Sequence, residues 1–176
     1  TLSSNLVDGE GVGRVLSALH GFSMPIGIRK VTKDDEKLLF DWANDPYVRK
    51  FAFNGKPITK EEHHDWFRGK FNDPDTLILV GLDSKKIPIG QVRIDSADEV
   101  GMIDLSVDSA ARGLGYATIL LKESIKFWKS TKSKKPLVGD VLIANKASRK
   151  VFINAGFREQ DNDDAYISGV FRYILD

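Results

Sequence analysis

The stretch 102–124 constrains the fold of this chain most, because it changes from a strand pattern to a helix pattern across a glycine-rich turn. Apolar and polar residues alternate from Ile103 to Val107, as in a strand with two different faces. From Tyr116 onward apolar residues recur at helical spacing, with no proline inside. The turn between them reads Arg112-Gly113-Leu114-Gly115-Tyr116-Ala117.

Such a turn suits a pyrophosphate. Small residues let a ligand approach the backbone, and the first amides of the following helix lie unpaired at the positive end of its dipole. A Walker A motif would need Gly-Lys-Ser/Thr, and a Rossmann fingerprint would stand early in a repeated βαβ pattern, whereas this turn lies late in the chain. A loop that only reverses the chain is the alternative.

Two motifs resemble the cofactor segments of the GNAT family of N-acetyltransferases. The spacing Arg-x-x-Gly-x-Ala, formed by Arg112, Gly115 and Ala117, resembles the acetyl-CoA motif. In the segment 145–157, Asn-x-x-Ser followed by Gly-Phe resembles the second motif, whose Asn and Ser contact the pantetheine and phosphate region. Two ordered motifs arise by chance far more rarely than one. The resemblance implies an α/β fold with a mixed, mostly antiparallel sheet of about six to seven strands and about four flanking helices.

The resemblance also implies acetyl-CoA as the cofactor. The expected cofactor-binding residues are Leu105, Ser106, Val107, Arg112, Gly113, Leu114, Gly115, Tyr116, Ala117, Asn145, Ser148 and Phe152. Many family members carry at the position of Phe152 a tyrosine that protonates the leaving thiolate, which a phenyl ring cannot do. Either another hydroxyl serves or the thiolate leaves to water; the candidate hydroxyls are those of Ser148, Tyr116 and Tyr173.

Acetyl transfer to an amine needs an uncharged amine and a stabilised oxyanion. The family implies direct attack without an acyl-enzyme, in agreement with a chain that has no cysteine. It also implies an oxyanion-stabilising backbone amide near Val107, aimed by a β-bulge. Asp104 is the expected base, because it faces the substrate side if Leu105 faces the core; a plain surface carboxylate is the other interpretation. Alternative bases are Asp95, Glu99 and His63.

An earlier segment points to the acceptor. The pattern Trp42-Ala-Asn44-Asp-x-x-Val48-Arg49, followed by Ile58-x-x-Glu61-Glu-His63-x-x-Trp66-Phe67, resembles the substrate side of the N-acetyltransferases acting on UDP-4-amino-4,6-dideoxy sugars in pseudaminic-acid biosynthesis. Looser versions occur in the branch that acetylates ribosomal proteins, so a protein N-terminus is the alternative acceptor. A coenzyme-binding module without turnover is a third hypothesis.

The arginine of this segment offers a planar fork for a phosphate or stacks on a base. A solvated position is the alternative for Arg49 and His63, and core packing for Trp66. The expected acceptor-binding residues are Asn44, Arg49, Phe53, His63, Trp66 and Arg93.

Composition excludes several other functions. The chain has 176 residues with 26 basic and 25 acidic side chains, which fits one globular domain and gives no electrostatic reason to expect nucleic acid or an anionic membrane. The absence of cysteine excludes disulfides, a thiolate metal site and a cysteine nucleophile. No apolar stretch approaches the ~20 residues of a spanning helix, and the N-terminus lacks a signal-peptide pattern, so a cytoplasmic location is expected. The oligomeric state stays open.

Residues 1–23 differ from the expected acetyltransferase domain, 24–176. Within residues 1–21, Asn-Leu-Val-Asp-Gly-Glu-Gly-Val-Gly-Arg-Val resembles the C-terminal end of the hydrolases that cleave UDP from a diacetamido sugar in the pseudaminic-acid pathway. This resemblance implies that the chain is the C-terminal half of a bifunctional enzyme. The alternative is an N-terminal arm docked on the domain.

Start and stop signals predict the remaining elements. A strand over 26–31 is followed by a helix capped by Thr32, which Pro46 should break. Thr59 and Glu62 form a capping box for the next helix, and Gly156 should end the helix of the second motif. The basic loop 132–136 is either solvated or close to the coenzyme's 3′-phosphate. Further strands are expected over 76–82, 87–95, 100–107, 137–143 and 165–175.

Overall fold

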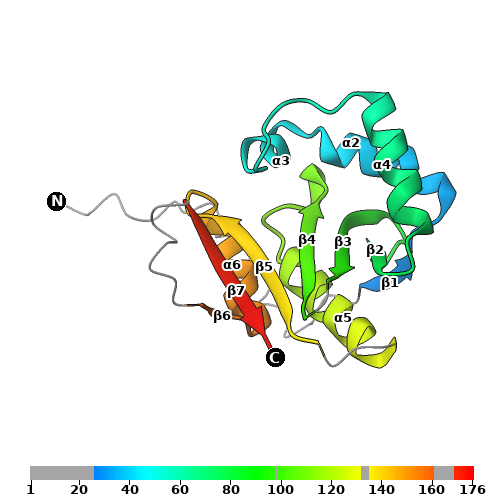
Figure 1. Ribbon diagram of the computed structural model, residues 1–176. Coiled ribbons are helices and arrows are strands. Elements are labelled where there is room, and N and C mark those ends of the chain that lie inside the picture. The colour runs from blue at the N-terminus through cyan, green and yellow to red at the C-terminus, as the bar shows by residue number, and fades with distance from the viewer. Residues whose placement is uncertain (1–25, 98, 132–134, 161–168) are drawn as a thin grey trace.

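One mixed sheet forms the centre of the molecule (Figure 1). The computed structural model describes residues 26–97, 99–131, 135–160 and 169–176, and within them seven strands run in the order β1-β2-β3-β4-β5-β7-β6. Only β4 and β5 pair in parallel; the other neighbours pair antiparallel, as the sequence predicts. The strands are β1 (Gly27–Lys30), β2 (Thr76–Leu82), β3 (Pro88–Ser96), β4 (Gly101–Val107), β5 (Leu137–Leu142), β6 (Arg158–Glu159) and β7 (Val170–Leu175).

Helices cover both faces of the sheet. One face carries α5 and α6, which pack against each other, and the other carries α2 and α4. The short α3 follows α2 and lies above the end of β4 in Figure 1. The helices in the described residues are α2 (Glu36–Ala43), α3 (Pro46–Lys50), α4 (Lys60–Asn72), α5 (Tyr116–Thr131) and α6 (Lys146–Ala155), with two 3-10 turns, η1 (Lys33–Asp35) and η2 (Ser109–Ala111).

Strand alternation divides the apolar side chains between two cores. On β2, Ile78 and Val80 pack with Leu39, Trp42 and Phe67 under α2 and α4. On the opposite face, side chains of β3, β4, β5 and β7 pack under α5 and α6, with Leu120, Leu121, Leu137 and Tyr173 fully buried. The sheet is therefore held from both sides, and only its ends are open for a ligand.

The local signals confirm several predicted boundaries, and the structure adds the short helix α3. Thr59 Oγ1 accepts from the Glu62 amide at 3.1 Å, and Glu62 Oε2 accepts from the Thr59 amide at 2.8 Å, which is the predicted capping box. Gly156 ends α6 with φ at 101°. Helix α2 ends at Ala43, which confirms the predicted break before Pro46, and Pro46 occupies the first turn of the short helix α3 with Asp45 as its cap. Proline suits that position because the first amides of a helix have no partner inside it.

Strands β4 and β5 separate soon after they meet. Only Gly101 and Met102 of β4 have partners on β5, and the two strands diverge upward in Figure 1. The Gly101 amide donates to the Pro136 carbonyl on the β5 side at 2.8 Å. Because alternate residues of a strand point the same way, the amides of Leu105 and Val107 also face this side, where β5 has moved away. The separation leaves the amides of Leu105 and Val107 without a partner on β5, so this edge of β4 can bond a ligand.

Some predicted features lie elsewhere or outside the described residues. Lys135 of the basic loop donates to Ser96 and Ala97 at the end of β3, so this lysine is far along the sheet from the glycine turn. Residues 1–23 and the part of the predicted terminal strand before residue 169 are outside the described ranges.

Candidate functional site

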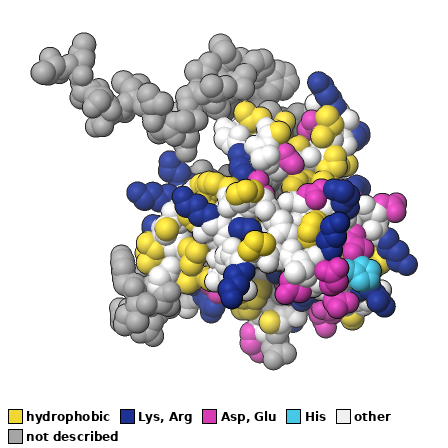
Figure 2. Space-filling model, turned by 90° about the horizontal axis from the view of Figure 1, so that it is seen from above, with side chains coloured by type: hydrophobic (Ala, Val, Ile, Leu, Met, Phe, Trp, Pro, Cys, Tyr) yellow, Lys and Arg dark blue, Asp and Glu magenta, His cyan; other side chains and the backbone are white. Residues whose placement is uncertain are grey.

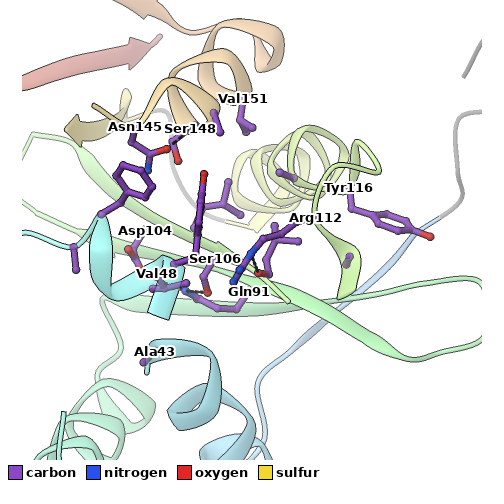
Figure 3. Close-up of a pocket in the computed structure, with 18 of the residues that line it drawn as sticks. Ala43, Val48, Gln91, Asp104, Ser106, Arg112, Tyr116, Asn145, Ser148 and Val151 are labelled. Carbon is purple, nitrogen blue, oxygen red and sulfur yellow. Dashed lines mark hydrogen bonds between the residues drawn. The ribbon is translucent and has the colours of Figure 1, made fainter. Parts of the chain in front are cut away.

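A cavity of about 1520 Å³ lies where β4 and β5 separate. Its walls come from the glycine turn and α5, from α6, from β3 and β4, and from the helices α2 to α4. Seen from above, hydrophobic side chains gather near the centre of this face together with Lys and Arg side chains (Figure 2). In Figure 3, Asn145 and Ser148 lie on one side of the cavity, with Val48 and Ala43 on the other. The cavity thus joins the two predicted regions, one for the coenzyme and one for the acceptor.

The coenzyme half contains an open glycine turn. We call residues 108–115 the coenzyme turn. Gly113 and Gly115 have φ values of 74° and 82°, which residues with a side chain adopt only with strain. A Cβ built on either glycine meets no atom within 4 Å. The backbone before α5 is therefore open toward the cavity, with the unpaired first amides of a 16-residue helix behind it. This geometry fits a pyrophosphate.

The second motif closes the opposite wall of the coenzyme half. Asn145 Oδ1 accepts from the Ser148 amide at 3.1 Å and so caps α6. Both residues line the cavity, as does the free edge of β4 at Leu105 and Val107. An amide-bearing arm such as pantetheine can pair with such a strand edge. Every predicted cofactor-binding residue except Phe152 lines the cavity.

Phe152 lies in the core instead. Its side chain is 4% exposed, stacks on Tyr173 with ring centroids 5.6 Å apart, and packs edge-on against Phe157 at 5.0 Å. Across from it stands Gly139 of β5, where any Cβ would collide with the ring. The ring fills the space above this glycine, and Phe152 is not among the cavity-lining residues.

The other candidate hydroxyls differ in their access to the cavity. Tyr173 is fully buried and does not line it; its hydroxyl donates to Glu159 at 2.7 Å and accepts from Arg149 at 3.0 Å. Tyr116 lines the cavity, but its ring points away from Asn145 and Ser148 in Figure 3. Ser148 is the candidate whose side chain reaches the cavity beside the second motif.

The motif arginine joins the coenzyme turn to the start of α3. Arg112 Nη2 donates to Asp45 at 2.7 Å, Nε donates to the Val107 carbonyl at 3.1 Å, and the guanidinium lies 5.0 Å from the centre of the Tyr47 ring. Arg112 therefore lines the cavity with its charge already paired.

A row of polar side chains on β3 and β4 forms the floor of the acceptor half. Gln91 Nε2 donates to Asp104 Oδ2 at 3.1 Å and contacts Ser106 Oγ at 3.4 Å. Arg93 Nη1 lies 3.9 Å from Asp104 Oδ2. Gln91 is only 8% exposed, and its role is not evident in the sequence, where it is one polar residue of a strand. Its register opposite Ser106 places it in the cavity.

Asp104 is the carboxylate of this floor. Its side chain is 54% exposed and lines the cavity. The alternative base Asp95 does not line the cavity. Burial raises the pKa of Asp95, but the bonds from Lys70, Thr76 and Arg93 outweigh this effect and hold that pKa below its usual range. Glu99, the other alternative, is exposed in the β3–β4 connection and does not line the cavity.

His63 of α4 presents an unsatisfied nitrogen at the cavity. The residue is 2% exposed. The centroid of its ring lies 5.4, 5.2 and 6.2 Å from the ring centroids of Phe40, Trp66 and Phe67. Its Nε2 has no hydrogen-bond partner among the described residues. Burial is the main cause that lowers the pKa of His63 below 6.5, so the neutral ring is favoured at neutral pH.

The remaining predicted acceptor residues divide into two groups. Arg49, Trp66 and Arg93 line the cavity, and the Arg93 guanidinium lies 5.3 Å from the centre of the Trp66 ring. Asn44 does not line it, because its side chain bonds both the amide and the carbonyl of Ile58 and ties α2 to the segment before α4. Phe53 is 69% exposed and also lies outside the lining.

Arg49 uses only some of its hydrogen-bond donors within the described residues. Its Nη1 donates to the carbonyls of Asn54 at 3.0 Å and Lys56 at 3.2 Å, which holds the segment between α3 and α4. Its Nε is buried and has no partner among the described residues. Arg49 therefore shapes the cavity wall, and its unpaired Nε lies beneath the surface of that wall.

Comparisons with known proteins agree with this geometry. Residues 26–158 match the family model of the acetyltransferase (GNAT) domain. An uncharacterised protein of Methanocaldococcus jannaschii, MJ1062, is 26% identical over 144 residues, which are 79% of this chain and 29% of that protein. The chain thus spans less than a third of the curated relative that it matches.

Solved structures share the fold. Spermidine N-acetyltransferase from Vibrio cholerae, in complex with CoA and spermine, is similar with a TM-score of 0.73 and 16% identity, covering 85% of this chain and 94% of that one. A domain from Methanocaldococcus jannaschii has a TM-score of 0.73 and 21% sequence identity, covering 86% of this chain and 97% of that one. Aminoglycoside acetyltransferase AAC(6')-Ib in complex with coenzyme A has a TM-score of 0.70 and 17% sequence identity, covering 86% of this chain and 94% of that one. In the part of the chain that is described, no helix has the length and apolarity to cross a membrane.

Proposed function

The chain belongs to the GNAT acetyltransferase family and is an N-acetyltransferase domain that uses acetyl-CoA, and we propose that its acceptor is the 4-amino group of a UDP-amino-dideoxy sugar. The pathway is pseudaminic-acid or another surface-polysaccharide biosynthesis. The acceptor-side pattern from Trp42 to Phe67 supports this assignment, as does the resemblance of residues 1–21 to the pathway's UDP-sugar hydrolase. A hydrolase fused before residues 24–176 is part of the same proposal.

The charge of the acceptor half carries the proposal. Two guanidinium groups, Arg49 and Arg93, and one carboxylate, Asp104, line this half of the cavity, and Arg93 also pairs at 2.8 Å with Asp95 outside the lining. A polyamine or an aminoglycoside would bring several ammonium groups toward these arginines, which Coulomb repulsion opposes. An acceptor with one amine and a diphosphate matches the distribution, because the amine can approach Asp104 while the phosphates approach an arginine.

Two buried polar atoms support an acceptor rich in hydroxyl groups. Arg49 Nε and His63 Nε2 both lack partners among the described residues, and both residues line the cavity. An unmet buried donor or acceptor costs about 1–3 kcal/mol, and a ligand gains affinity by supplying the missing bond once the cavity wall shifts to uncover these atoms. Sugar hydroxyl and acetamido groups donate and accept, and can meet both needs.

The polar floor supplies the acid–base chemistry. Acetyl-CoA would supply a thioester here: as the amine forms its C–N bond to the carbonyl carbon, the C–S bond would break, and coenzyme A would leave as a thiolate that takes a proton from Ser148 or water. We assign to Asp104 the acceptance of the amine proton, and to Gln91 the orientation of that carboxylate through its 3.1 Å bond. The free amides of Leu105 and Val107 are candidates to stabilise the oxyanion. The β3–β4 register runs without a break from Gly90 opposite Val107 to Ser96 opposite Gly101, so the expected β-bulge is not found there.

The first test is thiol release from acetyl-CoA with UDP-4-amino-4,6-dideoxy-N-acetyl-altrosamine as the acceptor. Spermidine and a ribosomal N-terminal peptide run in parallel. Turnover with the sugar nucleotide and competition by UDP are expected. Turnover with the peptide or spermidine alone would refute the sugar, and tight acetyl-CoA binding without thiol release would favour a silent binding module.

Arg49 provides a matched test of the nucleotide. Arg49→Ala should raise the KM for the sugar nucleotide about tenfold with little change in the KM for acetyl-CoA, because the acceptor half loses a cation and the two bonds that hold the segment between α3 and α4. Arg68, exposed on α4 and outside the cavity, offers the control Arg68→Ala. An equal effect of both substitutions on the KM for the sugar nucleotide would argue against a phosphate contact at Arg49.

A further inference from the structure

The carboxylate of Asp45 joins an acceptor-side helix to the coenzyme turn. Its Oδ1 caps α3 by accepting from the amides of Tyr47 at 2.9 Å and Val48 at 3.1 Å. The same oxygen accepts from Arg112 Nη2 at 2.7 Å, across 67 positions of sequence. One side chain therefore fixes the start of α3 and the middle of the turn together.

Asp108 forms the reciprocal connection. Its Oδ1 caps η2 within the coenzyme turn by accepting from the Ala110 amide at 2.8 Å. Its Oδ2 accepts from Trp42 Nε1 of α2, also at 2.8 Å. Each side of the connection thus contributes a capping carboxylate and receives a donor from the other side.

These contacts are protected from water to different degrees. Trp42 is 5% exposed, and the side chains of Asp45 and Arg112 are 19% and 28% exposed. Burial raises the pKa of Asp45, but the bonds from Arg112 and the α3 amides outweigh it and keep this carboxyl ionised at neutral pH. The Tyr47 ring covers the guanidinium. The Asp45–Arg112 and Asp108–Trp42 hydrogen bonds therefore contribute more to stability than fully exposed hydrogen bonds to a carboxylate would.

Beyond the Asp108 amide, which donates to the Ile89 carbonyl at 2.9 Å, and the buried Ala111, the turn has few other restraints. Its two glycines, Gly113 and Gly115, have open space where a Cβ would stand, so no packing from side chains at these positions fixes the backbone there. Asp108 at the start of the turn and Arg112 before the glycines are its anchored points. An anion cradle binds well only when its amides are held in place before the ligand arrives.

We propose that Trp42 and Asp45 are positioning residues for coenzyme binding, although they belong to the acceptor-side helices and do not line the cavity. They hold the coenzyme turn through Asp108 and Arg112, and so preset the amides that receive the pyrophosphate. The inference needs only the coenzyme site of the family and is independent of the acceptor proposed above.

The test uses coenzyme A alone. Asp45→Asn keeps a helix-capping oxygen but loses the charge that pairs with Arg112, and Trp42→Phe keeps a ring but loses the N–H donor. Each should raise the calorimetric Kd for coenzyme A about 5–20-fold. Amide hydrogen exchange of the free protein should quicken across the coenzyme turn. The double variant should bind still more weakly.

Two controls separate positioning from general damage. Asp41→Asn removes an exposed ion pair with Lys37 on the same helix, α2, and should leave the Kd unchanged. Leu38→Ala removes partly buried surface from α2 and lowers stability while both connections stay intact. Folded Asp45→Asn and Trp42→Phe proteins that bind coenzyme A within twofold of the original chain would overturn the proposal. A weakening by Leu38→Ala equal to theirs would do the same.

Discussion

The side-chain amide of Gln91 donates to Asp104 across the β3–β4 ladder at 3.1 Å, and this bond orients a half-exposed carboxylate in the cavity. If Asp104 accepts the amine proton, Asp104→Asn should lower kcat about 10²-fold with a small change in the KM for acetyl-CoA. Gln91→Met, which keeps length but removes the donor, should lower kcat about tenfold. Steady-state kinetics of thiol release measure both.

Ser106 provides the control for that pair. Its hydroxyl makes only the longer, 3.4 Å contact with Gln91, so Ser106→Ala should leave kcat within about threefold. Loss of activity in Ser106→Ala but not in Gln91→Met would assign the orientation of Asp104 to the hydroxyl instead.

Gly115→Val should abolish coenzyme binding. The new side chain would stand in the open space of the turn, on a backbone with φ at 82°. Isothermal titration with coenzyme A measures the loss. Gly169→Val is a matched control, since Gly169 has φ at 71° and open space but does not line the cavity. Retained coenzyme binding by Gly115→Val would mean that the turn is not the pyrophosphate site.

Phe152→Tyr should reduce stability without raising kcat. The added hydroxyl would lie among Gly139, Phe157 and Tyr173, where the ring is already packed, and a buried hydroxyl without a partner costs about 1–3 kcal/mol. Urea unfolding and thiol-release kinetics measure the two effects. A rise in kcat would show that the ring reaches the coenzyme sulfur.

The buried ring of His63 should make stability depend on pH. Its folded-state pKa is lowered by burial, so between that pKa and about 6.5 the unfolded chain binds more protons than the folded one. The free energy of unfolding should therefore rise with pH through this window and level off above it. His63→Phe should flatten the rise, measured as Tm from pH 5 to pH 7.5.

The coenzyme half of the site could be predicted because its determinants are contiguous in the sequence. Glycines that leave the backbone open, a strand before them and a helix after them all appear within 102–124. The capping residue Asn145 is likewise recognisable from Ser148, three positions later. The same locality explains why the capping box at Thr59 was correct.

The acceptor half depends on contacts between distant segments. Asp45 and Arg112 are 67 positions apart, and nothing near either residue indicates its partner. Gln91 enters the cavity through strand register, which no local pattern fixes. Phe152 stands one helical turn after Ser148, which lines the cavity, so its position along α6 does not predict that its ring turns away. The ring fills the space above Gly139 of β5, a contact that no pattern near Phe152 indicates.

A ligand that binds where β4 and β5 part should lengthen the lifetime of the protein. Few backbone bonds join the two parts of the sheet, and the coenzyme cavity lies where they part. A ligand at 100 times its Kd adds about 2.7 kcal/mol to the free energy of unfolding, which lowers the unfolded fraction open to proteases about 100-fold. A cell rich in acetyl-CoA should therefore keep this protein longer than a starved one, so that the amount of enzyme follows the supply of its own acetyl donor.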